Sequence, residues 1–257
     1  MLVNWLPMIF VLGALILAGV LVIRKFAIPG SDSETAVGTF VAPTVLSLYL
    51  IATAMGLVIG WENNNGARDL ALEEATAATR LYWTTGSLPA EQGEPIREDL
   101  RSYVTSVIEE DWPLMAEGEL SQAGESKLAQ LRAHVAQLPS DDYELAGERM
   151  LAHQQAAQLV ADRLERDDAA GANLPVLLIA AAAAAAAAVV VLPFALKGRR
   201  SRATLMWSLV NLAFVCSSVL TLVMLDNPYS GIFAVSAEPF ENALAGFDEI
   251  DQMLTGV

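Results

Sequence analysis

Four long apolar stretches divide the chain, and none of them contains Asp, Glu, Lys or Arg. They cover residues 5–23, 40–60, 174–196 and 203–225. A helix needs roughly 20 apolar residues, and at least about 17, to cross a bilayer core of about 30 Å. The pattern therefore predicts an all-α integral membrane protein with four transmembrane helices. No Lys or Arg precedes the first stretch, whose apolar part is long, so we interpret it as a retained span and not as a cleaved signal peptide.

The second stretch passes without a Pro into a charged segment with a helical repeat. Ala67, Ala71, Ala75 and Ala78 recur at intervals of four, four and three. This spacing predicts that span two continues as one long helix beyond the bilayer, with a narrow face packed on other helices. Its first turns form a candidate pore mouth or packing collar, in which Asn and Gly also permit a local break: Trp61, Glu62, Asn63, Asn64, Asn65 and Arg68.

Residues 61–172 are predicted to form an extramembrane helical domain between spans two and three. We expect one helix to begin after Pro95 and to close at residues 109–113, a second over residues 120–137, and a long third helix with Ser140 as its N-cap. The predicted organisation is a transmembrane hairpin over 1–60, this domain over 61–172, a second hairpin over 173–225 and a tail over 226–257.

The tail combines a turn with an amphipathic helix. Turn-forming residues follow the fourth span directly and predict a membrane-exit turn: Asp226, Asn227, Pro228 and Gly231. Farther on, apolar residues recur at intervals of four, three, three and four: Phe240, Leu244, Phe247, Ile250 and Leu254. The tail has no basic residue, and anionic lipid would repel it, so we expect this helix to pack on the helical domain.

Charge is strongly negative and concentrated outside the apolar stretches. The formal net charge is −15, and residues 61–172 hold 9 basic and 22 acidic residues, which gives 9 − 22 = −13. Nucleic acid is excluded as a partner because phosphate binding needs a basic surface. The expected partners are the lipid bilayer, other copies of the chain and small ions.

Basic residues in short loops predict the orientation in the cell membrane. One loop carries Arg24 and Lys25, and the loop over 197–202 carries four bases. Such loops lie on the cytoplasmic side. The helical domain and the C-terminus then lie together on the extracytoplasmic side, and an even number of spans keeps them on one side in either orientation.

No motif in the sequence indicates catalysis, a cofactor or a metal. Three consecutive acids, Glu109, Glu110 and Asp111, suggest a cation site, but neighbouring helical residues point in different directions and no calcium-loop pattern is present. His134 and His153 match no ligand spacing. A phosphate loop, a Gly-x-Ser-x-Gly elbow and a zinc-protease helix are absent from the sequence. We therefore predict a protein that is not an enzyme.

Several short motifs in one order resemble the bestrophin-like bacterial membrane proteins, a domain family of unknown function. They are Trp61, Asn64 and Gly66-Ala67-Arg68; Glu74-Ala75; Ile96-Arg97 with Tyr103; Glu110 to Trp112; and Asp226-Asn227-Pro228-Tyr229-Ser230-Gly231. Bestrophins are pentameric anion channels with four spans and a helical domain between spans two and three. The resemblance thus implies an oligomeric ion channel. It also implies a cytosolic domain, opposite to the basic-loop prediction, and the bestrophin calcium clasp and aromatic constriction match no residues here.

Two hypotheses of function follow. The first is an oligomeric channel or pore with span two and its extension near the axis. The second is a non-conducting, membrane-anchored binding or scaffold protein that acts through the acidic domain and tail. The charge-free spans argue against a charged filter and permit a hydrophobic gate.

Overall fold

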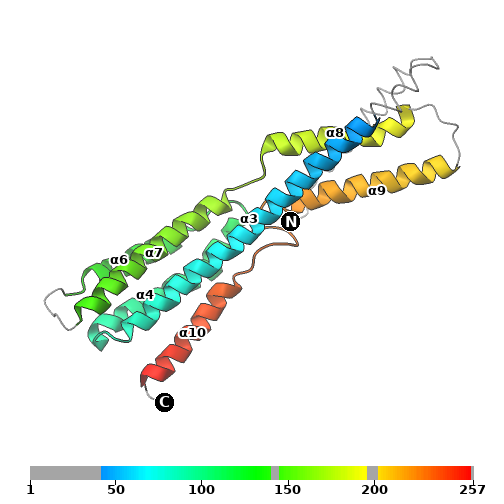
Figure 1. The fold of residues 1–257 in the computed structure, drawn as a ribbon. Helices are drawn as coiled ribbons and strands as arrows, with labels where there is room; N and C mark the ends of the chain where they lie inside the picture. Colours follow the sequence, from blue (N-terminus) through cyan, green and yellow to red (C-terminus); the bar gives the residue numbers. More distant parts are fainter. Residues whose placement is uncertain (1–41, 140–144, 196–201, 256–257) are drawn as a thin grey trace. The chain divides into compact units, whose positions relative to one another are not determined.

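The computed structural model describes residues 42–139, 145–195 and 202–255, and within these ranges every regular element is helical (Figure 1). The elements are α3 (Ala42–Thr85), α4 (Ala90–Ser106), the π-helical turn η2 (Val107–Asp111), α5 (Trp112–Met115), α6 (Gln122–Ala136), α7 (Ala146–Ala170), α8 (Val176–Ala195), α9 (Arg202–Met224) and α10 (Glu238–Thr255). The predicted first span, the N-cap Ser140 and most of the basic loop residues lie outside the described ranges.

The described chain divides into two compact units, and α3 contributes to both. The first unit contains α3 as far as Gly60 together with Leu174–Asp226. The second contains Trp61–Asn173 and the chain from Asn227 onward. The division within α3 falls where its sequence changes from apolar to charged.

Helix α3 runs without interruption through 44 residues, so the alternative of a break at residues 62–66 is wrong. An Asn or Gly in a helix interior costs about 1 kcal/mol or less relative to Ala, which packing of the opposite face can offset. Among the described helices, α3 is the one long and apolar enough to cross a membrane. The apolar parts of α8 and α9, Val176–Val190 and Leu209–Met224, are shorter. The count of four spans therefore stays a prediction.

Small residues bring the helices of the first unit close together. A Cβ atom on Gly60 would lie 2.7 Å from Cβ of Leu225 and 3.1 Å from its carbonyl oxygen. The Tyr49 hydroxyl is hydrogen-bonded to the Ser218 hydroxyl. Close backbone approach and polar pairs of this kind hold helices together in lipid, where the hydrophobic effect does not drive helix association.

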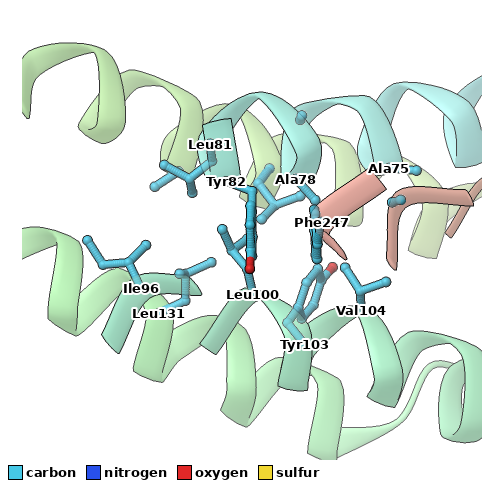
Figure 2. Close-up of a cluster of buried hydrophobic side chains, with 14 of the residues drawn as sticks. Ala75, Ala78, Leu81, Tyr82, Ile96, Leu100, Tyr103, Val104, Leu131 and Phe247 are labelled. Atoms are coloured by element: carbon cyan, nitrogen blue, oxygen red, sulfur yellow. The ribbon is translucent and has the colours of Figure 1, made fainter. Parts of the chain in front are cut away.

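The second unit is built around an apolar core to which α3, α4, α6, α7 and α10 contribute (Figure 2). Ala71, Ala75 and Ala78 of the predicted alanine face lie in this core, and Ala67 is buried in a neighbouring cluster with Met115 and Tyr229. From α10, Phe247 stacks on Tyr82 with ring centroids 4.0 Å apart and an angle of 5° between the planes. The prediction that the tail helix packs on the helical domain is confirmed. Leu254, in the last turn of α10, is 43% exposed and does not join the core.

Two predicted helix boundaries are wrong. Helix α4 begins at Ala90, and Pro95 lies inside it. Because Pro95 follows so soon after the start, it leaves only the carbonyl of Glu91 without a helical donor, and Glu91 is exposed to water. The helix also does not close at residues 109–113, because η2 carries it directly into α5. The chain turns after Met115 instead, where Gly118 adopts a φ of 84°.

Candidate functional site

The predicted collar on α3 divides into a buried and an exposed side. Asn64 is 4% exposed, and its Nδ2 donates a hydrogen bond to the carbonyl oxygen of Phe233 at 2.8 Å. Asn63 is half-buried, whereas the other four residues are exposed: Trp61, Glu62, Asn65 and Arg68. Asn64 therefore holds the protein's own tail, and the exposed four form the part of the collar that can face another molecule.

The exposed side of the collar continues as a stripe along α3. Trp61, Asn65, Arg68 and Leu72 follow one another at intervals of four, three and four, and all are exposed. Residues at this spacing lie above one another on a helix. The stripe combines an aromatic ring, an amide, a positive charge and a leucine, so it suits contact with another protein surface or with water and ions. We call these four residues the α3 stripe.

The predicted exit-turn residues form a tight, hydrogen-bonded segment. Asp226 Oδ1 accepts a hydrogen bond from the backbone N–H of Leu174 at 3.0 Å. Asn227 Oδ1 accepts one from the backbone N–H of Tyr229 at 2.7 Å, which is the Asx-turn chemistry expected of Asn. Gly231 adopts a φ of 84°, a conformation that other residues rarely take. These contacts give the segment a structural role, and its position at a membrane exit stays a prediction.

A buried network of two carboxylates and two guanidinium groups lies in the second unit. Arg166 Nε and Nη2 donate to Glu74 Oε2 and Oε1 at 2.5 and 3.0 Å. Arg166 Nη2 also reaches Asp111 Oδ2 at 3.1 Å. Arg163 Nη1 and Nη2 contact the two oxygens of Asp111 at 2.5 and 3.3 Å. All four side chains are buried, and their charges balance. We call Glu74, Asp111, Arg163 and Arg166 the ion network.

Neutral groups complete the surroundings of the ion network. The Tyr103 hydroxyl donates to Glu74 Oε1. The backbone N–H of Ser121 donates to Asp111 Oδ1 at 2.9 Å. The guanidinium of Arg166 lies over the rings of Trp112 and Phe240, at 5.8 and 5.4 Å from their centroids. The network thus connects α3, α4, α7, α10 and the chain around η2, and every one of its charges has several partners.

Mutual attraction keeps the network charged despite burial. Burial would raise the pKa of Asp111, but its hydrogen bonds and its attraction to Arg163 and Arg166 bring the pKa below the usual value. Burial would lower the pKa of Arg166, yet Glu74 and Asp111 raise it. Burial and the neighbouring Glu74 raise the pKa of Tyr103, so its hydroxyl stays a hydrogen-bond donor at neutral pH. The ion network therefore stabilises the packing of the helices. None of its four side chains is free to act as an acid, a base or a nucleophile.

The acidic triplet does not converge on one point. Asp111 is completely buried in the ion network, whereas Glu109 and Glu110 are exposed. Within the described ranges, no group of three or more His, Cys, Asp or Glu side chains is placed to hold a metal ion. His134 Nδ1 contacts Asp99 Oδ2 at 2.5 Å and thereby joins α6 to α4.

Comparison with models of known protein families shows to which family this chain belongs. The family model of the bestrophin-like domain matches residues 9–240. The chain belongs to the bestrophin-like family. This assignment agrees with the resemblance read from the sequence motifs, and a search of curated proteins finds no significant match.

Solved structures show the same bestrophin fold. A bacterial bestrophin homologue from Klebsiella pneumoniae is 17% identical, with a TM-score of 0.65 over 97% of this chain and 98% of that chain. A point mutant of a bestrophin homologue from the same organism is 15% identical, with a TM-score of 0.67 over 97% and 99%. A structure described as a membrane protein is 15% identical, with a TM-score of 0.63 over 98% and 99%. This bestrophin-like protein is therefore an all-helical membrane protein.

Several residues of the sequence motifs that resemble the bestrophin-like family make buried contacts that hold the fold together. Glu74, Tyr103 and Asp111 belong to the ion network or its surroundings, and Asn64 holds the tail. The sequence analysis did not predict the ion network, although the position of Glu74 indicated a buried acid. It follows Ala67 by seven residues and Ala71 by three, which places an acid on the apolar face of α3. A buried acid requires a buried partner, but no local pattern distinguishes Arg166 from the other bases of its helix.

Proposed function

We propose that this bestrophin-like protein is an oligomeric ion channel or pore in which span two and its extension along α3 lie nearest the axis. Family membership over residues 9–240 supports conduction by analogy, because bestrophins are anion channels. The observation that carries the position of the axis is the exposed α3 stripe. A helix whose opposite face is buried in its own chain presents this stripe to neighbouring copies or to a water-filled mouth.

The exposed collar residues suggest how ions would be handled. Glu62 and Arg68 carry opposite charges six residues apart, and both are exposed. Residues 42–60 of the same helix contain no charge. A polar mouth of mixed charge above an apolar passage suits a hydrophobic gate better than a charged filter. We propose that the protein assembles as a homo-oligomer in the lipid bilayer and passes small ions.

Flux measurements on the purified protein test this proposal. Oligomeric protein in liposomes is expected to conduct chloride or small cations, and Arg68→Ala is expected to change their relative permeability. Arg132→Ala is the matched control, because Arg132 is exposed on α6, away from the collar. A confirmed oligomer without flux would contradict the channel and favour the non-conducting scaffold. Equal permeability ratios in both variants would remove Arg68 from the conduction path.

We also propose that residues 1–60 and 173–225 form the transmembrane hairpins of a cell-membrane protein, with the helical domain and tail on the extracytoplasmic side. The basic loops support this orientation, and the bestrophin analogy opposes it. Glu119 lies exposed between α5 and α6, so we choose it as the site of a fusion. A reporter enzyme that works only outside the cytoplasm is expected to be active at this site. An inactive but stable fusion would reverse the orientation.

A further inference from the structure

The segment that follows α9 exposes two large apolar side chains. Ile232 is 77% exposed and Phe233 is 40% exposed. We infer that this segment inserts Ile232 and Phe233 into the lipid headgroup and acyl-chain boundary and thereby anchors the protein at the membrane surface. We call these two residues the interfacial patch.

The first step of the argument concerns the ends of two apolar stretches. Gly60 is the last residue of the apolar stretch over residues 40–60, and Leu225 is the last residue of the stretch over 203–225. These residues are in direct contact, because a Cβ atom on Gly60 would lie 2.7 Å from Cβ of Leu225. The two stretches therefore end at the same level. In a membrane protein, that level is the edge of the hydrocarbon core.

The second step gives the depth of the segment. Asn64 Nδ2 donates to the carbonyl oxygen of Phe233 at 2.8 Å, which fixes Phe233 beside Asn64. An α-helix rises about 1.5 Å per residue, so Asn64 lies about 6 Å beyond Gly60 along α3. The interfacial layer on each side of the hydrocarbon core is about 5–7 Å thick. The segment is thus tied to α3 only four residues after the apolar stretch, a length of helix that this layer can contain.

The third step shows that the segment cannot withdraw its apolar side chains. Its two ends are held together, since the backbone N–H of Val235 donates to the carbonyl oxygen of Pro228 at 2.9 Å. Trp112 Nε1 donates to the carbonyl oxygen of Val235 at 3.1 Å. Tyr229 and Val235 point into the protein and are 5% and 4% exposed. With both flanks buried, the middle of the segment projects outward with Ile232 at its tip.

Composition identifies lipid as the occupant. Segments that lie in the membrane interface bury apolar side chains such as Phe and Leu at the boundary of headgroups and acyl chains. The chain after Leu225 contains no Lys or Arg, so attachment depends on transfer of apolar surface and requires no anionic lipid. A second copy of the chain is the alternative occupant, and it would shield position 232 from lipid as well as from water.

Depth-dependent fluorescence quenching tests the inference on the full chain. Cys216 is the single cysteine, so Cys216→Ser provides the background for Ile232→Cys carrying an environment-sensitive dye. In phosphatidylcholine vesicles we expect blue-shifted emission, and quenching at least twofold stronger by lipids with a shallow nitroxide than by lipids with a deep one. Met253→Cys is the matched control, because Met253 is 62% exposed on α10. Its dye should respond to aqueous iodide and not to lipid.

The outcomes separate lipid from its alternatives. Iodide quenching at position 232 equal to that at position 253 would place the segment in water and overturn the inference. Protection from both iodide and lipid quenchers, with cross-linking between copies, would assign the patch to a subunit interface and also overturn it. Phe233→Cys gives a second reading if the first variant misfolds. Asn64→Leu removes the hydrogen bond that sets the depth, and it should raise iodide quenching at position 232 at least twofold.

Discussion

Arg166 and Glu74, 92 residues apart in the chain, form a two-point ion pair that is completely buried. The guanidinium Nε and Nη2 atoms contact the two carboxylate oxygens at 2.5 and 3.0 Å, and neither side chain is exposed. Removal of two charges from water is costly, and their attraction offsets this cost only while both partners are present. The pair therefore enforces one arrangement of α3 against α7, since any other arrangement leaves a buried charge alone.

The first prediction concerns this pair. Glu74→Gln and Arg166→Met should each lower the free energy of unfolding by about 3–5 kcal/mol, because each leaves an uncompensated buried charge. The double variant should lose clearly less than the sum of the two, since it removes both charges. Denaturant unfolding of the detergent-solubilised protein measures the three differences. Strict additivity would show that the two residues act independently.

The second prediction is an acid transition that depends on Asp111. Its pKa in the folded protein lies below the usual value of about 3.9 for Asp, so the unfolded chain binds the proton more readily. The stabilisation by Asp111 is complete above about pH 4 and is lost as the pH falls through and below this value. Asp111→Asn should unfold more easily at pH 7, and its difference from the wild type should shrink toward pH 3. Melting temperatures of the wild type and Asp111→Asn, measured from pH 7 to pH 3, check this prediction. A difference between the two proteins that does not change with pH would contradict it.

The third prediction compares two helical glycines. A Cβ on Gly93 would lie 2.6 Å from the carbonyl oxygen of Thr85, whereas nothing lies within 4 Å of one on Gly246. Gly93→Ala should destabilise the protein by about 1–3 kcal/mol, because backbone must move. Gly246→Ala should stabilise it by up to about 1 kcal/mol through helix propensity. Melting temperatures that shift in opposite directions are expected, and a stabilising Gly93→Ala would show that α4 can move away from Thr85.

The fourth prediction separates two attachments of the tail helix. Phe247 is completely buried on Tyr82, whereas Arg101 joins α10 through partly exposed contacts to Asp248 and Asp251 at 2.7 and 2.8 Å. Phe247→Ala should cost about 3–5 kcal/mol and release α10. Arg101→Ala should cost about 0–1 kcal/mol, with an effect that weakens in high salt.

Hydrogen exchange over α10 measures the release. Fast exchange in Phe247→Ala, with near-normal exchange in Arg101→Ala, is expected. The reverse order would make the ion pairs the main attachment of the tail. Glu249→Ala serves as a surface control, since Glu249 is exposed on α10.

Repeating patterns made several features predictable. The extension of α3 beyond its apolar part follows from alanines that recur at helical spacing, and the packing of α10 follows from Phe240, Phe247 and Ile250 on one face. Each depends on residues within a few turns of one another. The start of α4 was not predictable in this way, because the effect of Pro95 depends on whether water can reach the carbonyl it leaves unpaired.

Periodicity and composition were enough to predict the helical class, the apolar lengths and the faces of α3 and α10, because both are local properties of the chain. Tertiary structure alone decided which polar groups are buried. Asn64 faces the protein while Asn65 faces outward, and Asp111 meets two arginines while Glu110 remains in water. Adjacent residues of one type differ in this way because successive residues of a helix point in directions about 100° apart, so the surrounding segments bury one side chain and leave the next in water. Such partners come from residues far apart in the chain, and no local pattern encodes them.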